Sequence, residues 1–75
     1  MMIEFYICYK TEDSVNKSVC IDSIYAGAFN LFKQQIGEDF SKIIEVEVCT
    51  VREYVSLAVG LEFAIMAKVK EERSK

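Results

Sequence analysis

The chain has 75 residues, of which 52% are hydrophobic, with a formal net charge of −3 and no Pro, Trp or His. This length allows one small domain over residues 1–75, and a domain of this size buries only about 60% of the surface that its unfolded chain exposes. The weak negative charge disfavours binding to nucleic acid or to an anionic membrane surface, so we expect neither as a partner.

Three cysteines, Cys8, Cys20 and Cys49, occur at spacings that match no zinc motif and no disulfide framework. The absence of His removes the commonest general base and every Ser–His or Cys–His pair. We therefore expect free thiols in a reducing cytoplasm, with no catalytic residue, no metal and no cofactor. The first residues lack the pattern of a signal peptide, and no apolar run is long enough to span a membrane.

The first predicted strand is Met2–Lys10, in which apolar side chains alternate with polar ones. Its inward residues are Ile3, Phe5, Ile7 and Tyr9. Thr11–Asn16 is polar and is predicted to be a loop, and Lys17–Asp22 is predicted to be a short second strand that completes a hairpin. The alternative is a helix that already begins near Ser18.

A helix is predicted from Ile24 to Ile36. Asp22 or Ser23 can cap its first N–H groups, and Gly37 can adopt the left-handed conformation that ends it. The apolar residues of this region recur three or four positions apart, which gives one core-facing stripe. The stripe consists of Ile21, Tyr25, Ala28, Phe29, Phe32 and Ile36.

After a short connection at Glu38–Lys42, the alternation in Ile43–Val51 predicts another strand. A reversal is expected within Thr50–Tyr54, although no Asn-Gly or Asp-Gly turn marks it. The charged segment Lys70–Lys75 is predicted to be a frayed tail.

The segment Val55–Val69 is apolar at every odd position, which favours a long strand with one continuous apolar side. A competing interpretation makes Leu57–Arg73 a helix, because Ala, Leu, Met, Glu and Lys are good helix formers. Two residues argue against the helix. Glu62 would lie on the same side of the helix as apolar residues, and Gly60 would weaken the helix interior. We therefore expect the strand.

The predicted fold class is α+β, with a single helix packed on a small antiparallel sheet in the order β-(β)-α-β-β and a long C-terminal strand. A fifteen-residue strand is about 50 Å long, whereas the predicted helix covers about 20 Å. The uncovered apolar surface predicts a homo-oligomer, unless the strand bends at Gly60 and folds over its own helix. The surface expected to contact a partner comprises Tyr6, Cys8, Ala58, Ala64 and Met66.

These features favour a non-enzymatic oligomer that binds another macromolecule, such as a protein partner, in an accessory or inhibitory role. The alternative is a small-molecule-binding oligomer, since the order strand–helix–long strand–long strand resembles that of the dodecin flavin-storage proteins in topology alone. Those proteins stack flavin on a Trp, which this chain lacks. Four carboxylates could attract a hard cation, but a solvated face partnered by Lys10 and Lys68 is the expected arrangement. They are Glu4, Glu45, Glu47 and Glu62.

Overall fold

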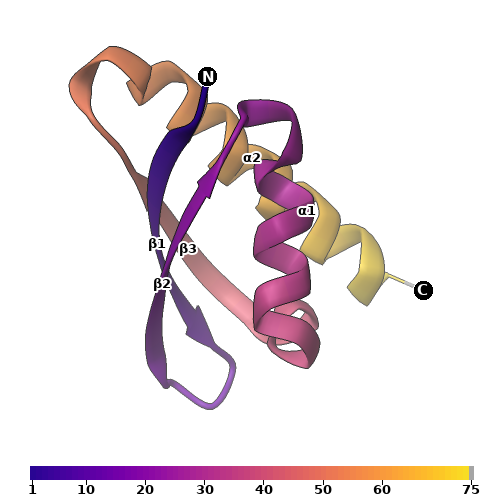
Figure 1. Cartoon of the computed structure of the whole chain (residues 1–75). Helices are drawn as coiled ribbons and strands as arrows, with labels where there is room; N and C mark the ends of the chain where they lie inside the picture. Colours follow the sequence, from indigo (N-terminus) through magenta and orange to yellow (C-terminus); the bar gives the residue numbers. More distant parts are fainter. Residues whose placement is uncertain (75) are drawn as a thin grey trace.

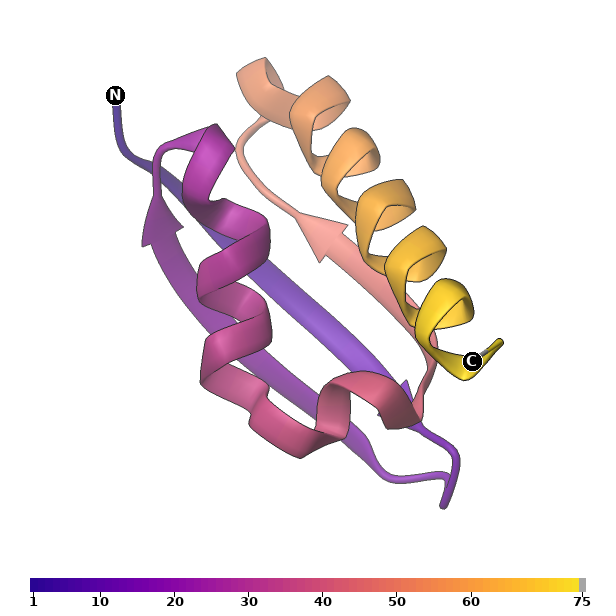
Figure 2. The same cartoon turned by 90° about the vertical axis from the view of Figure 1, so that its right-hand side faces the viewer.

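The computed structural model describes residues 1–74, which form a three-stranded antiparallel sheet and two α-helices. The elements are β1 (Ile3–Thr11), β2 (Asn16–Ser23), α1 (Tyr25–Ile36), the 3-10 helix η1 (Gly37–Lys42), β3 (Ile43–Cys49), the 3-10 helix η2 (Arg52–Tyr54) and α2 (Val55–Arg73). The strand order is β2-β1-β3, so β1 is central (Figure 1). Both helices lie on the same face of the sheet (Figure 2). The α+β class and the antiparallel sheet are confirmed.

The hairpin of β1 and β2 forms where the alternating pattern predicts it. Inward residues of β1 are buried: Ile3, Phe5, Ile7, Tyr9 and Thr11. The turn is closed by the N–H of Ser14, which donates to the carbonyl of Thr11, and Ser14 has a φ of 65°. The Thr11 hydroxyl also donates to the carboxylate of Asp13. The alternative helix beginning near Ser18 is therefore wrong.

The predicted helix from Ile24 to Ile36 is confirmed as α1, but its capping differs. Neither Asp22 nor Ser23 caps it; the Ser23 hydroxyl donates instead to the carbonyl of Ile24. Gly37 ends the helix as expected, with a φ of 60° that a side chain would strain.

An aromatic cluster closes one end of the core. The ring of Phe32 packs edge-on against Tyr9 and Phe40, with ring centroids 5.8 and 6.3 Å apart. The hydroxyl of Tyr9 donates to Asp39, which also pairs with Lys17 at 2.6 Å. These contacts attach η1, which the sequence predicted only as a connection, to the hairpin.

The expected long strand is wrong, because residues 55–69 lie within α2. The helix buries Ala58, Leu61, Ile65 and Val69, which are three or four positions apart. Glu62 and Gly60, which argued against a helix, are both accommodated by contacts with residues distant in the sequence. The carboxylate of Glu62 accepts the N–H of Val48 at 3.0 Å, and Gly60 leaves room for a side chain of α1.

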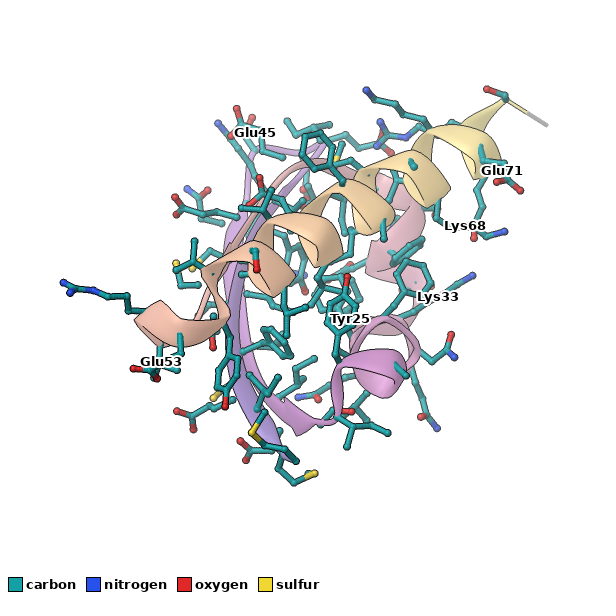
Figure 3. The ribbon with its side chains drawn as sticks, turned by 90° about the horizontal axis from the view of Figure 1, so that it is seen from above. Tyr25, Lys33, Glu45, Glu53, Lys68 and Glu71 are labelled. Carbon is teal, nitrogen blue, oxygen red and sulfur yellow. The ribbon has the colours of Figure 1, made fainter. Side chains whose placement is uncertain are left out.

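The space beside Gly60 is occupied by Tyr25, which points from α1 toward α2 (Figure 3). A Cβ at Gly60 would lie 2.7 Å from the Tyr25 hydroxyl, so glycine permits this close packing of the helices. The two helices are further joined by an ion pair between Lys33 and Glu72 at 2.8 Å.

The observed order is therefore β-β-α-β-α, with two helices where the sequence predicted one. The α2 helix is about 28 Å long at about 1.5 Å per residue, which matches the sheet that it covers. No strand extends beyond the helices that cover the sheet, so strand length gives no reason to expect self-assembly. Residues 70–73, expected in a frayed tail, form the last turn of α2, and Lys75 lies outside the described residues.

The helix predicts opposite outcomes for two residues that a strand would place on the same side. Ile65→Ala should destabilise the protein by about 2–5 kcal/mol, because Ile65 is fully buried. Phe63→Ala should change stability by less than about 0.5 kcal/mol, because Phe63 is 72% exposed. Urea unfolding followed by circular dichroism measures both. Equal destabilisation by the two substitutions would contradict the helix.

Candidate functional site

The face of the sheet opposite the helices carries no other element of the described chain (Figures 1 and 2). We call it the open sheet face. Side chains of β1, β2 and β3 alternate between the core and this face. Its cross-strand rows are Cys20–Tyr6–Cys49, Ser18–Cys8–Glu47 and Asn16–Lys10–Glu45. The register therefore gathers all three cysteines around Tyr6, which is 44% exposed and donates a hydrogen bond to Ser18.

Two shallow hollows lie on the open sheet face. One is bordered by Cys8, Lys10, Asn16, Ser18, Glu45 and Glu47, and the other by Glu4, Tyr6, Cys49, Thr50 and Val51. Both hollows are open to solvent, whereas small-molecule sites enclose most of the ligand surface. This geometry suits contact with a broad surface better than capture of a small ligand.

The exposed thiols are held in their protonated form. Desolvation raises the pKa of Cys20, and the carboxylates of Glu4 and Asp22 raise it further. Desolvation likewise raises the pKa of Cys49, with the charge of Glu47 adding to it. A protonated thiol is a poor nucleophile and a poor metal ligand, so these cysteines lack the surroundings of a reactive thiol.

The four carboxylates considered as a cation cluster do not meet at one point. Glu45 lies opposite Lys10 in the sheet, and Glu47 lies opposite Cys8. Glu62 belongs to α2 and is engaged with the backbone of β3. Among residues 1–74, no group of three or more His, Cys, Asp or Glu residues is placed to hold a metal ion.

A second exposed surface lies on α2, on the side away from the sheet. Val55, Val59 and Phe63 follow one another at intervals of four, with exposed fractions of 51%, 47% and 72%. We call this line, continued by Ala67, the α2 outer face. A helix at the surface of a globular protein normally presents polar residues there. Charged residues lie near both ends of this line, with Glu53 just before α2 and Lys70 in its last turn.

The five residues expected to contact a partner are not brought to one surface. Tyr6 and Cys8 lie together on the open sheet face. Ala58 is 3% exposed and faces the core, because a helix rather than a strand carries it. Ala64 is exposed on α2, and Met66 is half-buried against the core.

The α2 outer face was missed because the odd positions of residues 55–69 were all expected to point inward. A signal for it was nevertheless present, since Val55, Val59, Phe63 and Ala67 are spaced at the helical interval of four. The same residues satisfy both periodicities, and only the fold distinguishes them.

Comparison with protein-family models, curated proteins and solved structures finds no match to this chain. Neither α1 nor α2 is long and apolar enough to cross a membrane, as far as the described residues extend.

Raised thiol pKa values predict slow alkylation at neutral pH. In a variant that retains only Cys49 (C8S/C20S), the rate of reaction with iodoacetamide should reach half its maximum above the ordinary thiol pKa of about 8.5. The reason is that the raised pKa delays formation of the thiolate as the pH increases. The same variant in concentrated urea is the control and should titrate near about 8.5. A midpoint below that of the unfolded control would contradict the prediction.

Proposed function

We propose that the protein acts without catalysis, by binding another protein through the α2 outer face in an accessory or inhibitory role. The observation that carries this proposal is the 72% exposure of Phe63, in line with Val59 and Val55 on a helix whose opposite side is already buried. At this exposure the ring contributes little to the packing of the chain itself.

Burial of these side chains at an interface would be energetically favourable. Full burial of a Val or Phe side chain contributes roughly 1.5–3 kcal/mol relative to leaving it exposed. Aromatic residues at the centre of an interface often dominate its affinity, with polar residues forming the rim. Phe63 has such a central position on α2, between Glu53 near the start of the helix and Lys70 toward its end.

The spacing of the exposed residues indicates how a partner would contact them. Apolar side chains at intervals of four along one helix face are the anchors of the helix-in-groove mode, in which an apolar groove of the partner receives the helix. The charged residues near both ends of α2 would then lie at the border of the contact. We therefore infer a partner with an apolar groove rather than nucleic acid or a membrane.

The absence of catalysis is supported by the chemistry of the open sheet face. The chain has no His, and the pKa values of Cys20 and Cys49 are raised rather than lowered. The small-molecule alternative started from the order strand–helix–strand–strand. That order is not observed, because α2 occupies the place of the last strand. No other observation favours this alternative.

A matched pair of substitutions tests the docking surface. Phe63→Glu places a charge at its centre, and Val15→Glu makes the same kind of change at an exposed apolar residue of the β1–β2 turn. Tagged wild type and both variants are used for affinity capture from native cells with mass spectrometry. We expect a protein retained by wild type and V15E but lost with F63E. Titration of that purified protein should show at least about tenfold weaker binding to F63E, as for a central interface residue.

Circular dichroism and thermal unfolding of all three proteins verify that the substitutions leave the fold intact. If wild type, V15E and F63E, all folded, capture the same proteins with the same affinity, the α2 outer face is not the docking surface and the proposal fails.

A further inference from the structure

The two edges of the sheet differ in whether their backbone groups are accessible. At the β3 edge, α2 packs beside the strand and its Glu62 carboxylate accepts the N–H of Val48 at 3.0 Å. At the other edge, no element of the described chain lies beyond β2 (Figure 2). Five of the eight residues of β2 are exposed, and a sixth, the half-buried Ser23, is the last residue of the strand. Only the β2 edge is thus open to another strand.

The direction of each backbone group follows from four hydrogen bonds. In antiparallel sheets, alternate residues of a strand bond to opposite neighbours. On β1, the backbone groups of even-numbered residues point toward β3. The carbonyl of Glu4 accepts a hydrogen bond from the Thr50 hydroxyl, and the N–H of Glu12, just after β1, donates to the carbonyl of Lys42. The backbone groups of odd-numbered residues point toward β2, as the hydrogen bond from the Thr11 N–H to the Val15 carbonyl shows. The outward N–H of Val48 on β3 fits the same alternation.

This alternation identifies the free groups of β2. The residues opposite Phe5, Ile7 and Tyr9 bond to β1, and they are Ile21, Val19 and Lys17. The N–H and C=O groups of the intervening residues point away from the sheet. These residues are Ser18, Cys20 and Asp22, and none of the backbone hydrogen bonds found outside the helices and strands of the described chain involves them. An edge with this many unpaired groups is a template for strand addition.

The geometry points to a second copy of this chain as the occupant of the β2 edge. Its β2 would pair antiparallel about a two-fold axis at Cys20, which joins the two sheets into one of six strands. Cys20 then lies opposite Cys20 of the second copy, Ser18 opposite Asp22, and Val19 opposite Ile21. Such an interface is isologous, since each contact occurs twice. It is separate from the α2 outer face and does not depend on the function proposed for that face.

The sequence of β2 favours this register over the one centred on Val19. A slip of one residue would turn every side chain to the wrong face, so only slips of two compete. A two-fold axis at Val19 would place Lys17 against the apolar Ile21. In the register centred on Cys20, β-branched Val19 and Ile21 meet on the inner face, and no like charges lie opposite one another.

The helix above β2 extends the contact. Lys33 marks the flank of α1 that faces α2, through its ion pair with Glu72. Leu31 lies about 200° around the helix from Lys33 and so belongs to the opposite flank, on the side of the β2 edge. Ile24, at the start of α1, is 51% exposed. The two-fold axis brings Leu31 toward its counterpart, whereas Ile24, which lies opposite Asn16 of the second copy in this register, adds exposed apolar surface at each end of the contact.

The size of the contact sets the expected affinity. Seven paired residues span about 23 Å, and a sheet with one helix layer is about 20 Å thick. The area removed from solvent is therefore roughly 900 Å² over both copies, near the lower limit for a specific interface. We expect a dimer that dissociates at micromolar concentrations.

Cross-linking of single-cysteine variants tests the two-fold axis. The variant retaining Cys20 (C8S/C49S) should be cross-linked to dimer by bismaleimidoethane, because the two Cα atoms of a hydrogen-bonded antiparallel pair are about 5.5 Å apart. The variant retaining Cys49 (C8S/C20S) is the matched control. Cys49 lies in the same cross-strand row as Cys20 but is separated from its counterpart by five strand spacings, about 24 Å. This variant should therefore remain monomeric on denaturing gels.

Charge changes at Ser18 test the register, because this residue would face Asp22 of the second copy at two symmetric places. In sedimentation equilibrium, Ser18→Glu should weaken dimerisation about tenfold through like charges, and Ser18→Lys should strengthen it several-fold. Ser56→Glu adds the same charge on α2 and should leave the dimerisation constant unchanged. Circular dichroism verifies the fold of each variant.

Three outcomes would overturn the inference. They are a monomer at 100 µM, equal cross-linking through Cys20 and Cys49, and a dimer that responds to Ser56→Glu but not to the substitutions at Ser18. The last outcome would place self-association on α2. The result of the F63E experiment on partner binding has no bearing on dimerisation through the β2 edge, so the two proposals can fail separately.

Discussion

The packing of α2 against β3 is the contact on which the rest of the structure depends. A three-stranded sheet needs cover for its apolar face, and α1 alone is too short and too narrow to supply it. Ala58, Leu61, Ile65 and Val69 of α2 fill that space, and the hydrogen bond from Val48 to Glu62 fixes the helix along the strand. Because both helices lie on one side of the sheet, the open sheet face is left to solvent, and a second set of apolar residues on α2, which includes Phe63, points away from the core.

The hairpin, α1 and β3 could be predicted from the sequence because each has one buried and one exposed side. In β1, for example, the alternation of Phe5 and Ile7 with polar residues reports the two faces of the sheet directly. Residues 55–69 give no such indication, because their apolar residues satisfy both the period of a strand and the period of a helix. The deciding contacts, Glu62 with Val48 and Gly60 beside Tyr25, join residues that are far apart in the sequence.

The candidate surfaces were predictable only to the extent that their elements were. Tyr6 and Cys8 were placed together correctly because β1 was assigned correctly. Their neighbours Cys20 and Cys49 depend on strand register, which is set by the length of the β1–β2 turn and by the irregularity between Lys10 and Thr11. The polar segment Thr11–Asn16 indicates the turn without fixing the register across it, and the irregularity has no signature in the sequence. The exposed line through Phe63 required the helix to be known first.

The unequal edges of the sheet also determine how far growth by strand addition can proceed. A subunit with two open edges would recruit neighbours without end and form filaments, as exposed edge strands do in aggregation. Here the Glu62 carboxylate accepts the outward N–H of Val48, so in the dimer proposed above both outer edges would have α2 and this hydrogen bond in the way of another strand. In that dimer the carboxylate that anchors α2 would also hinder the addition of a further strand, and its loss would free the Val48 N–H at each outer edge.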